Sequence, residues 1–193
     1  MTTFDAPPAF GRGAAARTTA DPSSFERLFP FFRIVVVIQG VHVVEHIVQF
    51  LQVNVFNVPG ERAFGLLGYV FQFNGTAEWM HLVFNVAYLA SLVVIGWRLY
   101  GLFQNAALPS SILWLFAIGG VLLETWHMVE HVVIIANVVR HHGCPCPGIG
   151  DRVLGVTDIQ LHLTYNAVTY SAVLLTFRFV AGMRSKARAI LEA

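Results

Sequence analysis

Four long stretches of mostly apolar residues alternate along the chain with shorter polar segments. They run from about 24 to 56, 78 to 100, 110 to 139 and 157 to 181. Each stretch equals or exceeds the roughly 20 residues that an α-helix needs to cross the hydrocarbon core of a membrane. The pattern therefore predicts an all-α integral membrane protein, a four-transmembrane-helix bundle.

Composition and charge agree with this fold class. Hydrophobic residues make up 56% of the 193 residues and charged residues only 12%, and the mean hydropathy is +0.64. Soluble domains carry about twice that share of charged residues. A net charge of +1 gives no indication of a nucleic-acid partner, so we expect membrane lipids to be the main surroundings.

Short sequence words recur in the two halves of the chain. Pro-Ser-Ser begins the first and third stretches at Pro22 and Pro109, and Leu-Gly precedes the second and fourth at Leu67 and Leu154. The longer words are His42-Val-Val-Glu45-His46 and His127-Met-Val-Glu130-His131, then His81-Leu-Val-Phe-Asn85 and His162-Leu-Thr-Tyr-Asn166. This internal similarity predicts two parallel-repeated helical hairpins, related by a pseudo-twofold axis along the membrane normal.

The repeat sets the expected organisation of the chain. Residues 1–22 lack the apolar core of a signal peptide and are interpreted as a disordered cytoplasmic tail. Residues 23–104 form the first hairpin and 109–183 the second, and 184–193 form a basic cytoplasmic C-terminal tail.

The distribution of basic residues predicts the orientation. Nine of the twelve Lys and Arg residues lie near the termini or the central connection, and only Arg62, Arg140 and Arg152 lie in the other two loops. Because basic residues favour the cytoplasmic side, we expect a multi-pass protein of the plasma (inner) membrane with both termini in the cytoplasm. The histidines then lie towards the outward face.

The two His-x-x-Glu-His words indicate metal binding. Side chains at i, i+3 and i+4 lie within roughly 100° of helix circumference, and ionisable groups at membrane depth usually serve a function. The predicted metal ligands are His42, Glu45, His46, His81, His127, Glu130, His131 and His162. Three His and one Glu per half would suit two metal ions, with iron preferred and copper next for such a nitrogen and oxygen donor set.

Other polar residues on the same helix faces are predicted to orient these ligands. They are Gln39, Glu78, Asn85, Glu124, Asp158 and Asn166, each three or four residues from a candidate histidine. Ligating imidazoles usually donate their second N–H to such groups. Glu78 and Glu124 also have the Glu-x-x-His spacing of di-iron bundles, so either is an alternative primary ligand.

A separate cluster lies in the loop after the third stretch. His141, His142, Cys144 and Cys146 could bind a soft metal such as Cu(I), or the two cysteines could form a strained disulfide. A rigid Pro/Gly turn with inert thiols is the plain alternative.

Together these features favour a membrane di-metal oxidoreductase, a monooxygenase-type enzyme that uses O2 to oxidise or hydroxylate a hydrophobic substrate. The sequence has no flavin, ferredoxin or dinucleotide motif, so the electron donor would be a separate protein or quinol. The alternatives are a metal-binding or metal-transport subunit for copper, zinc or iron, and a b-type haem subunit. The sequence leaves open whether the chain forms a homo-oligomer or joins a larger membrane complex. Because the ligands cluster at one level, a fixed site is favoured over an ion path.

Overall fold

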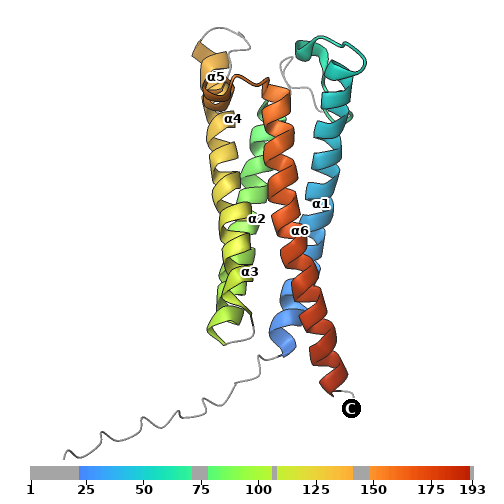
Figure 1. Cartoon of the computed structure of the whole chain (residues 1–193), viewed down its shortest axis with the longest axis vertical. Coiled ribbons are helices and arrows are strands. Elements are labelled where there is room, and N and C mark those ends of the chain that lie inside the picture. Colours follow the sequence, from blue (N-terminus) through green and yellow to red (C-terminus); the bar gives the residue numbers. More distant parts are fainter. Residues whose placement is uncertain (1–21, 71–77, 106–107, 141–147, 192–193) are drawn as a thin grey trace, which may run out of the picture.

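The computed structural model describes residues 22–70, 78–105, 108–140 and 148–191 (Figure 1). Every regular element in these ranges is a helix, which confirms the all-α class. In chain order they are α1 (Pro22–Asn54), η1 (Gly60–Arg62), α2 (Glu78–Gln104), α3 (Ser110–Leu115), the π-helix η2 (Phe116–Leu122), α4 (Leu123–Arg140), α5 (Ile149–Leu154) and α6 (Asp158–Leu191). The predicted tail at 1–22 lies outside the described residues except for Pro22.

Three helical segments are long and apolar enough to cross a membrane. They are Glu26–Asn54, Trp79–Gln104 and Ser110–Arg140, of which the last runs through α3, η2 and α4 without a break. Helix α6 has 34 residues but is not among them, because Thr, Tyr, Asn and Ser interrupt its apolar residues. The prediction of a membrane protein is thus supported by three helices, and the fourth span at 157–181 remains a prediction.

The long helices lie side by side (Figure 1). Helix α1 packs against α6, α2 packs against α4, and η2 contacts α6. We call the end where α1 begins and α6 ends the terminal end, and the opposite end, which carries η1 and α5, the loop end. In the terminal half an apolar core is fully buried, with Phe32, Leu92, Ile95, Leu99 and Phe116 all at 1% exposure or less.

A salt bridge holds α1 and α6 together at the terminal end. Glu26 accepts hydrogen bonds from the Nε atoms of Arg184 at 2.8 Å and Arg188 at 2.7 Å. These two arginines lie one turn apart on α6, so both reach the same carboxylate. The segment from 184, expected as a tail, continues α6 as far as Leu191.

The π-helix η2 brings the third span close to α6. A Cβ atom on Gly119 would lie 2.6 Å from the Cβ of Ala172, so the backbones approach at a distance that only glycine permits. The Leu123 N–H is directed to the carbonyl of Ile118, five residues earlier. Such turns are frequent at functional sites, and this one ends two residues before Glu124.

Substituting Gly119 with alanine should therefore force η2 away from α6. We expect a loss of about 1–3 kcal/mol in the free energy of unfolding, the usual effect of overpacking. Gly182→Ala is the matched control, because no atom lies within 4 Å of its would-be Cβ. Thermal unfolding in detergent measures both, and equal midpoints for the two variants would contradict the close packing.

Candidate metal centre

Six histidines from four helical segments meet in one buried cluster towards the loop end. None is more than 5% exposed, and neighbouring rings have centroids 4.5 to 6.0 Å apart. We call them the histidine cluster: His42 and His46 of α1, His81 of α2, His127 and His131 of α4, and His162 of α6. The structure thus brings all six predicted histidines together.

Both His-x-x-Glu-His words place their two imidazoles in the same way. The Nε2 atoms of His42 and His46 are 3.2 Å apart, and those of His127 and His131 are 3.1 Å apart. Two nitrogens bound to one metal at about 2.0–2.1 Å lie roughly 3.0–3.4 Å apart. A hydrogen bond between two neutral imidazoles has a similar length, so metal analysis distinguishes the two.

The six imidazoles can be grouped by helix into two trios, of which the second is compact and the first is more open. In the second, His127, His131 and His162 offer nitrogen atoms that all lie within 4.8 Å of one another. In the first, the ring of His81 lies 5.6 Å from that of His42 and 5.3 Å from that of His46. Each trio therefore takes two imidazoles from a His-x-x-Glu-His word and one from the helix that begins at the loop end.

The two trios are also in contact with each other. The ring centroids of His81 and His131 are 5.7 Å apart, and those of His46 and His162 are 6.0 Å apart. Two ions bound in the separate trios would therefore be close neighbours.

Glu45 binds backbone N–H groups of the segment that follows α1. Its Oε2 accepts from Leu66 at 2.7 Å and its Oε1 accepts from Gly68 at 3.1 Å, while Leu67 contacts both oxygens at 2.9 Å. Gly65, with a φ of +67°, has no room for a side chain here, because its Cβ would lie 2.2 Å from Glu45 Oε1. The carboxylate is buried and serves as an anchor for this segment.

Glu130 has the corresponding contacts in the second half. Its Oε2 accepts from Ile149 N–H at 2.7 Å and its Oε1 from Gly150 N–H at 2.8 Å. A Cβ on Gly148 would lie 2.4 Å from the same carboxylate. Both glutamates that were predicted as metal ligands thus accept hydrogen bonds from loop backbone N–H groups. Metal coordination by them stays a prediction.

Two further acids lie against the imidazoles. Asp158 contacts Nδ1 of His162 through its carbonyl oxygen at 2.8 Å and through Oδ1 at 2.9 Å. Glu124 Oε2 lies 3.5 Å from Nδ1 of His127, at the limit of a hydrogen bond. An imidazole that donates from Nδ1 presents the lone pair of Nε2 to a metal. The backbone carbonyl of Asp158 therefore sets the tautomer that His162 needs as a ligand, and the Asp158 carboxylate adds a charged contact.

Asp158→Ala should weaken metal binding by about tenfold, the lower end of the range for residues that orient a ligand. The carbonyl oxygen of residue 158 remains as one acceptor, which limits the loss. Asp158→Asn keeps a side-chain acceptor and should restore most of the affinity. Competition with a chelator measures both variants, and an unchanged affinity in Asp158→Ala would remove this role.

Acidic groups gather at α5 and at the start of α6. Asp151 accepts a hydrogen bond from Gly148 N–H at 3.3 Å. Burial, with the nearby charges of Asp158 and Glu130, raises the pKa of the Asp151 carboxyl. The like charges of these carboxylates therefore disfavour the ionised form of Asp151.

A layer of amide side chains lies next to the histidine cluster, on the side that faces the terminal end. Gln39 donates to Asn166 Oδ1 at 2.8 Å, and Asn166 donates to the carbonyl of His162 at 2.9 Å. The equivalent residues in the other half are Glu124 and Asn85. Both are fully buried, yet among the described residues Glu124 Oε1 and both polar atoms of the Asn85 side chain have no hydrogen-bond partner. The two halves thus differ in the hydrogen bonds of the side chains on the terminal side of the cluster.

Some predicted residues lie outside the description. They are the side chain of Glu78 and all of His141, His142, Cys144 and Cys146.

One contact beside the histidine cluster was not predicted from the sequence, because it joins residues far apart in the chain. Trp126 Nε1 donates to the hydroxyl of Tyr165 at 2.8 Å, and the Tyr165 ring lies 5.4 Å from that of His127.

Comparison of the chain with protein-family models, curated proteins and solved structures finds no match. A functional conclusion therefore depends on the chemistry of the site.

Proposed function

We propose that the chain is an integral membrane oxidoreductase that binds two metal ions in the histidine cluster. One ion is held by His42, His46 and His81, and the other by the trio from α4 and α6. The observation that carries this proposal is the pair of Nε2 contacts of 3.2 and 3.1 Å within six buried imidazoles. Burying so many ionisable side chains in apolar helices is costly unless they serve a site.

The donor set bears on the choice of metal. Imidazole suits iron, copper and zinc, whereas carboxylate bridges are typical of di-iron bundles. Glu45 and Glu130 bind loop backbone, which leaves mainly nitrogen donors for the metal. Such a donor set favours copper more strongly than the mixed nitrogen and oxygen set expected from the sequence. Iron remains the other candidate, with Glu124 as its nearest buried carboxylate.

A pair of redox metal ions, when bound, supplies the one-electron steps that O2 chemistry requires. Hydroxylation of a hydrophobic substrate R–H by O2 consumes two electrons and two protons and gives R–OH and water. A membrane quinol or a separate protein supplies the electrons. The chain's own part is to hold the imidazoles, through Asp158 and Glu124, and to exclude bulk water by burial of the cluster.

A fixed centre is better supported than an ion path. Between the amide layer and the terminal end, the described residues include no His, Cys, Asp or Glu other than Glu26, which binds two arginines. The core there consists of residues such as Leu92, Ile95 and Val173. An ion leaving the cluster in that direction would find no ligand.

We further propose that α6 is a fourth span and that the two hairpins are parallel repeats. The matching Nε2 contacts and the matching Glu45 and Glu130 anchors support the repeat. Most of the described Lys and Arg residues lie towards the terminal end, which favours a cytoplasmic location for it in the plasma (inner) membrane. The histidine cluster would then face outward.

Oxygen uptake tests this function. Purified protein in lipid discs, loaded with copper or iron, should consume O2 when a short-chain quinol and a hydrophobic R–H, such as a medium-chain alkane, are both added. His131→Ala should lower the rate at least about 100-fold, beyond the usual effect of losing a residue that only orients a ligand. Val132→Ala is the matched control, because this neighbour on α4 is 49% exposed and should leave the rate unchanged.

Each other result points to a different function. Bound metal without O2 uptake from any quinol would indicate a metal-binding or transport subunit. Sharp α and β bands in a reduced-minus-oxidised spectrum would indicate b-type haem instead. Equal rates in the His131→Ala and wild-type proteins would contradict the proposed role of the cluster.

A further inference from the structure

An aromatic side chain lies directly against a proposed metal ligand of the first trio. The ring of Phe84 on α2 stacks on that of His42, with the ring centroids 4.0 Å apart and the two planes 24° from parallel. Phe84 is only partly buried and packs against the apolar core. A molecule in contact with Phe84 would therefore be one side chain away from the first metal ion.

The equivalent position in the second half has a different chemical character. The repeated words His81-Leu-Val-Phe84 and His162-Leu-Thr-Tyr165 place Phe84 and Tyr165 three positions after their histidines. The Tyr165 ring lies 5.4 Å from that of His127, and its hydroxyl accepts a hydrogen bond from Trp126. The aromatic residue beside the first trio is thus wholly apolar, whereas the one beside the second trio carries a polar group.

The protein surface at the depth of the first trio is also apolar. Between 41 and 47 on α1 and between 81 and 88 on α2, the exposed residues are Val41, Val44, Ile47, Val83, Val86 and Ala87. In a membrane these side chains would contact the hydrocarbon tails of the lipids. A substrate dissolved among those tails would therefore meet only apolar side chains on its way to Phe84.

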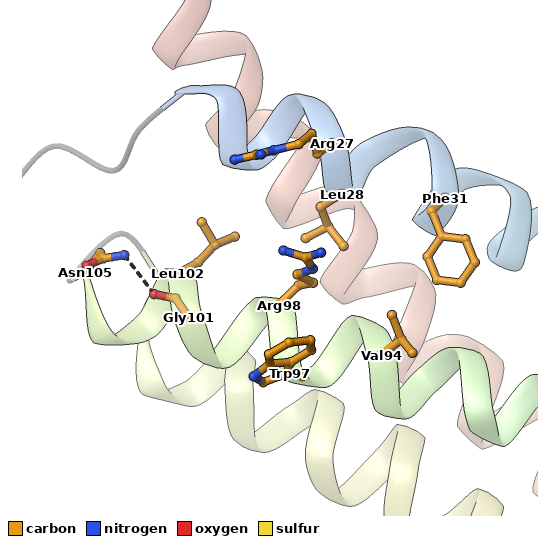
Figure 2. Close-up of a pocket in the computed structure, with 9 residues that line it drawn as sticks. All are labelled: Arg27, Leu28, Phe31, Val94, Trp97, Arg98, Gly101, Leu102 and Asn105. Atoms are coloured by element: carbon orange, nitrogen blue, oxygen red, sulfur yellow. Dashed lines mark hydrogen bonds between the residues drawn. The ribbon is translucent and has the colours of Figure 1, made fainter.

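A cavity elsewhere between α1 and α2 does not serve this purpose. It lies at the terminal end, has a volume of about 470 Å3, and includes Arg27, Arg98 and Asn105 in its lining (Figure 2). Arg98 follows Phe84 by 14 positions in α2, which places it about 21 Å further along the helix. A substrate bound in that cavity would be out of reach of the histidine cluster.

We propose that the hydrophobic substrate binds against Phe84, between α1 and α2, and is oxidised at the first trio. This inference rests on the proposed function and adds to it the place of the substrate and a residue that limits its size. In the balanced reaction R–H + O2 + QH2 → R–OH + H2O + Q, a substrate C–H bond breaks and a C–O bond forms. The quinol QH2 gives up the two electrons and two protons. Because Phe84 covers one face of His42, the bulk at position 84 limits how closely the C–H bond approaches.

Photolabelling of the full chain in lipid discs with a medium-chain alkyl diazirine tests the proposal without a need for activity. Peptide mapping should find label near Phe84 that an excess of medium-chain alkane removes. Phe84→Trp should lower this competed label at least about tenfold, because even one methylene in an apolar site is worth roughly 10–200-fold. Val86→Trp is the matched control: Val86 is 49% exposed, lies about 200° around the helix from Phe84, and should keep the competed label.

Three outcomes would overturn the proposal. They are label near Phe84 that the alkane does not remove, equal competed label in Phe84→Trp and the wild type, or competed label near Trp126 and Tyr165 in place of Phe84. Circular dichroism checks that each variant folds. If Phe84→Trp does not fold, Phe84→Ala tests the same contact, because the space it opens should let bulky adamantane compete better than in the wild type. Equal competition by adamantane in the two proteins would also overturn the proposal.

Metal analysis of the same samples separates this proposal from the proposed function. Competed label near Phe84 without bound metal would support the substrate site and contradict the metal centre. Bound metal without competed label would overturn the substrate site alone.

Discussion

Replacing His131 with alanine should lower the bound metal from about two ions per chain to one or none. His131 belongs to the trio whose nitrogen atoms lie within 4.8 Å of one another, and its ring also lies 5.7 Å from His81 of the other trio. Residues that only orient a ligand are worth about 10–100-fold in metal affinity, so the loss of a ligand itself should exceed that. Elemental analysis of the purified variant measures the result.

The pseudo-equivalent change, His46→Ala, should have the same effect on the first trio, because His46 and His42 have the same Nε2 contact. The exposed neighbours Val132 and Ile47 provide matched alanine controls that should keep both ions. Wild-type metal content in both histidine variants would show that the imidazoles are joined by hydrogen bonds alone.

Replacing Glu130 with alanine should destabilise the fold while leaving the metal content close to that of the wild type. Its carboxylate accepts two hydrogen bonds at 2.7 and 2.8 Å from the first turn of α5. Hydrogen bonds to a charged group are worth about 1.5–3 kcal/mol each, so the expected loss is about 3–6 kcal/mol. Glu45→Ala should behave alike, since it leaves the N–H groups of Leu66, Leu67 and Gly68 without their acceptor.

Thermal unfolding and metal analysis of the same samples separate the two possible roles of these glutamates. Asp151→Ala is the control for the loop, because it removes a longer contact of 3.3 Å to Gly148 and should cost less than Glu130→Ala. A Glu130→Ala protein that unfolds at the wild-type temperature but loses one metal ion would make Glu130 a ligand and contradict the anchoring role.

The meeting of the six histidines follows from local geometry that the sequence contains. Residues at i and i+4 of a helix lie one above the other, so each His-x-x-Glu-His word must place its two imidazoles together. His81 and His162 stand near the starts of α2 and α6, which places them at the same end of the bundle. Periodicity and the order of the stretches were sufficient for this prediction.

The partner of each glutamate could not be predicted in the same way. Glu45 lies on the same helix face as its histidines, but it binds N–H groups more than 20 residues later in the chain. The path of that segment depends on turns that periodicity does not describe. The glycines at 65, 148 and 150 were the available signal, since a carboxylate can approach their backbone closely.

Two features of the helices were also beyond the sequence pattern. The π-helix η2 lies in an apolar run without any break, so nothing in its hydropathy marks it. The extension of α6 to Leu191 agrees with the helix propensity of its Ala, Lys, Arg and Leu residues, but its contact with Glu26, 158 positions before Arg184, could not be predicted. Long-range pairs of this kind are fixed by packing and not by local propensity.

The most direct test of the account is the metal content of the wild-type chain. Protein purified from membranes without added chelator, and quantified by amino-acid analysis, should contain about two equivalents of copper or iron, one for each imidazole trio. Less than about half an equivalent of any transition metal, before and after incubation with Cu(I), Fe(II) and Zn(II), would contradict the proposed di-metal centre.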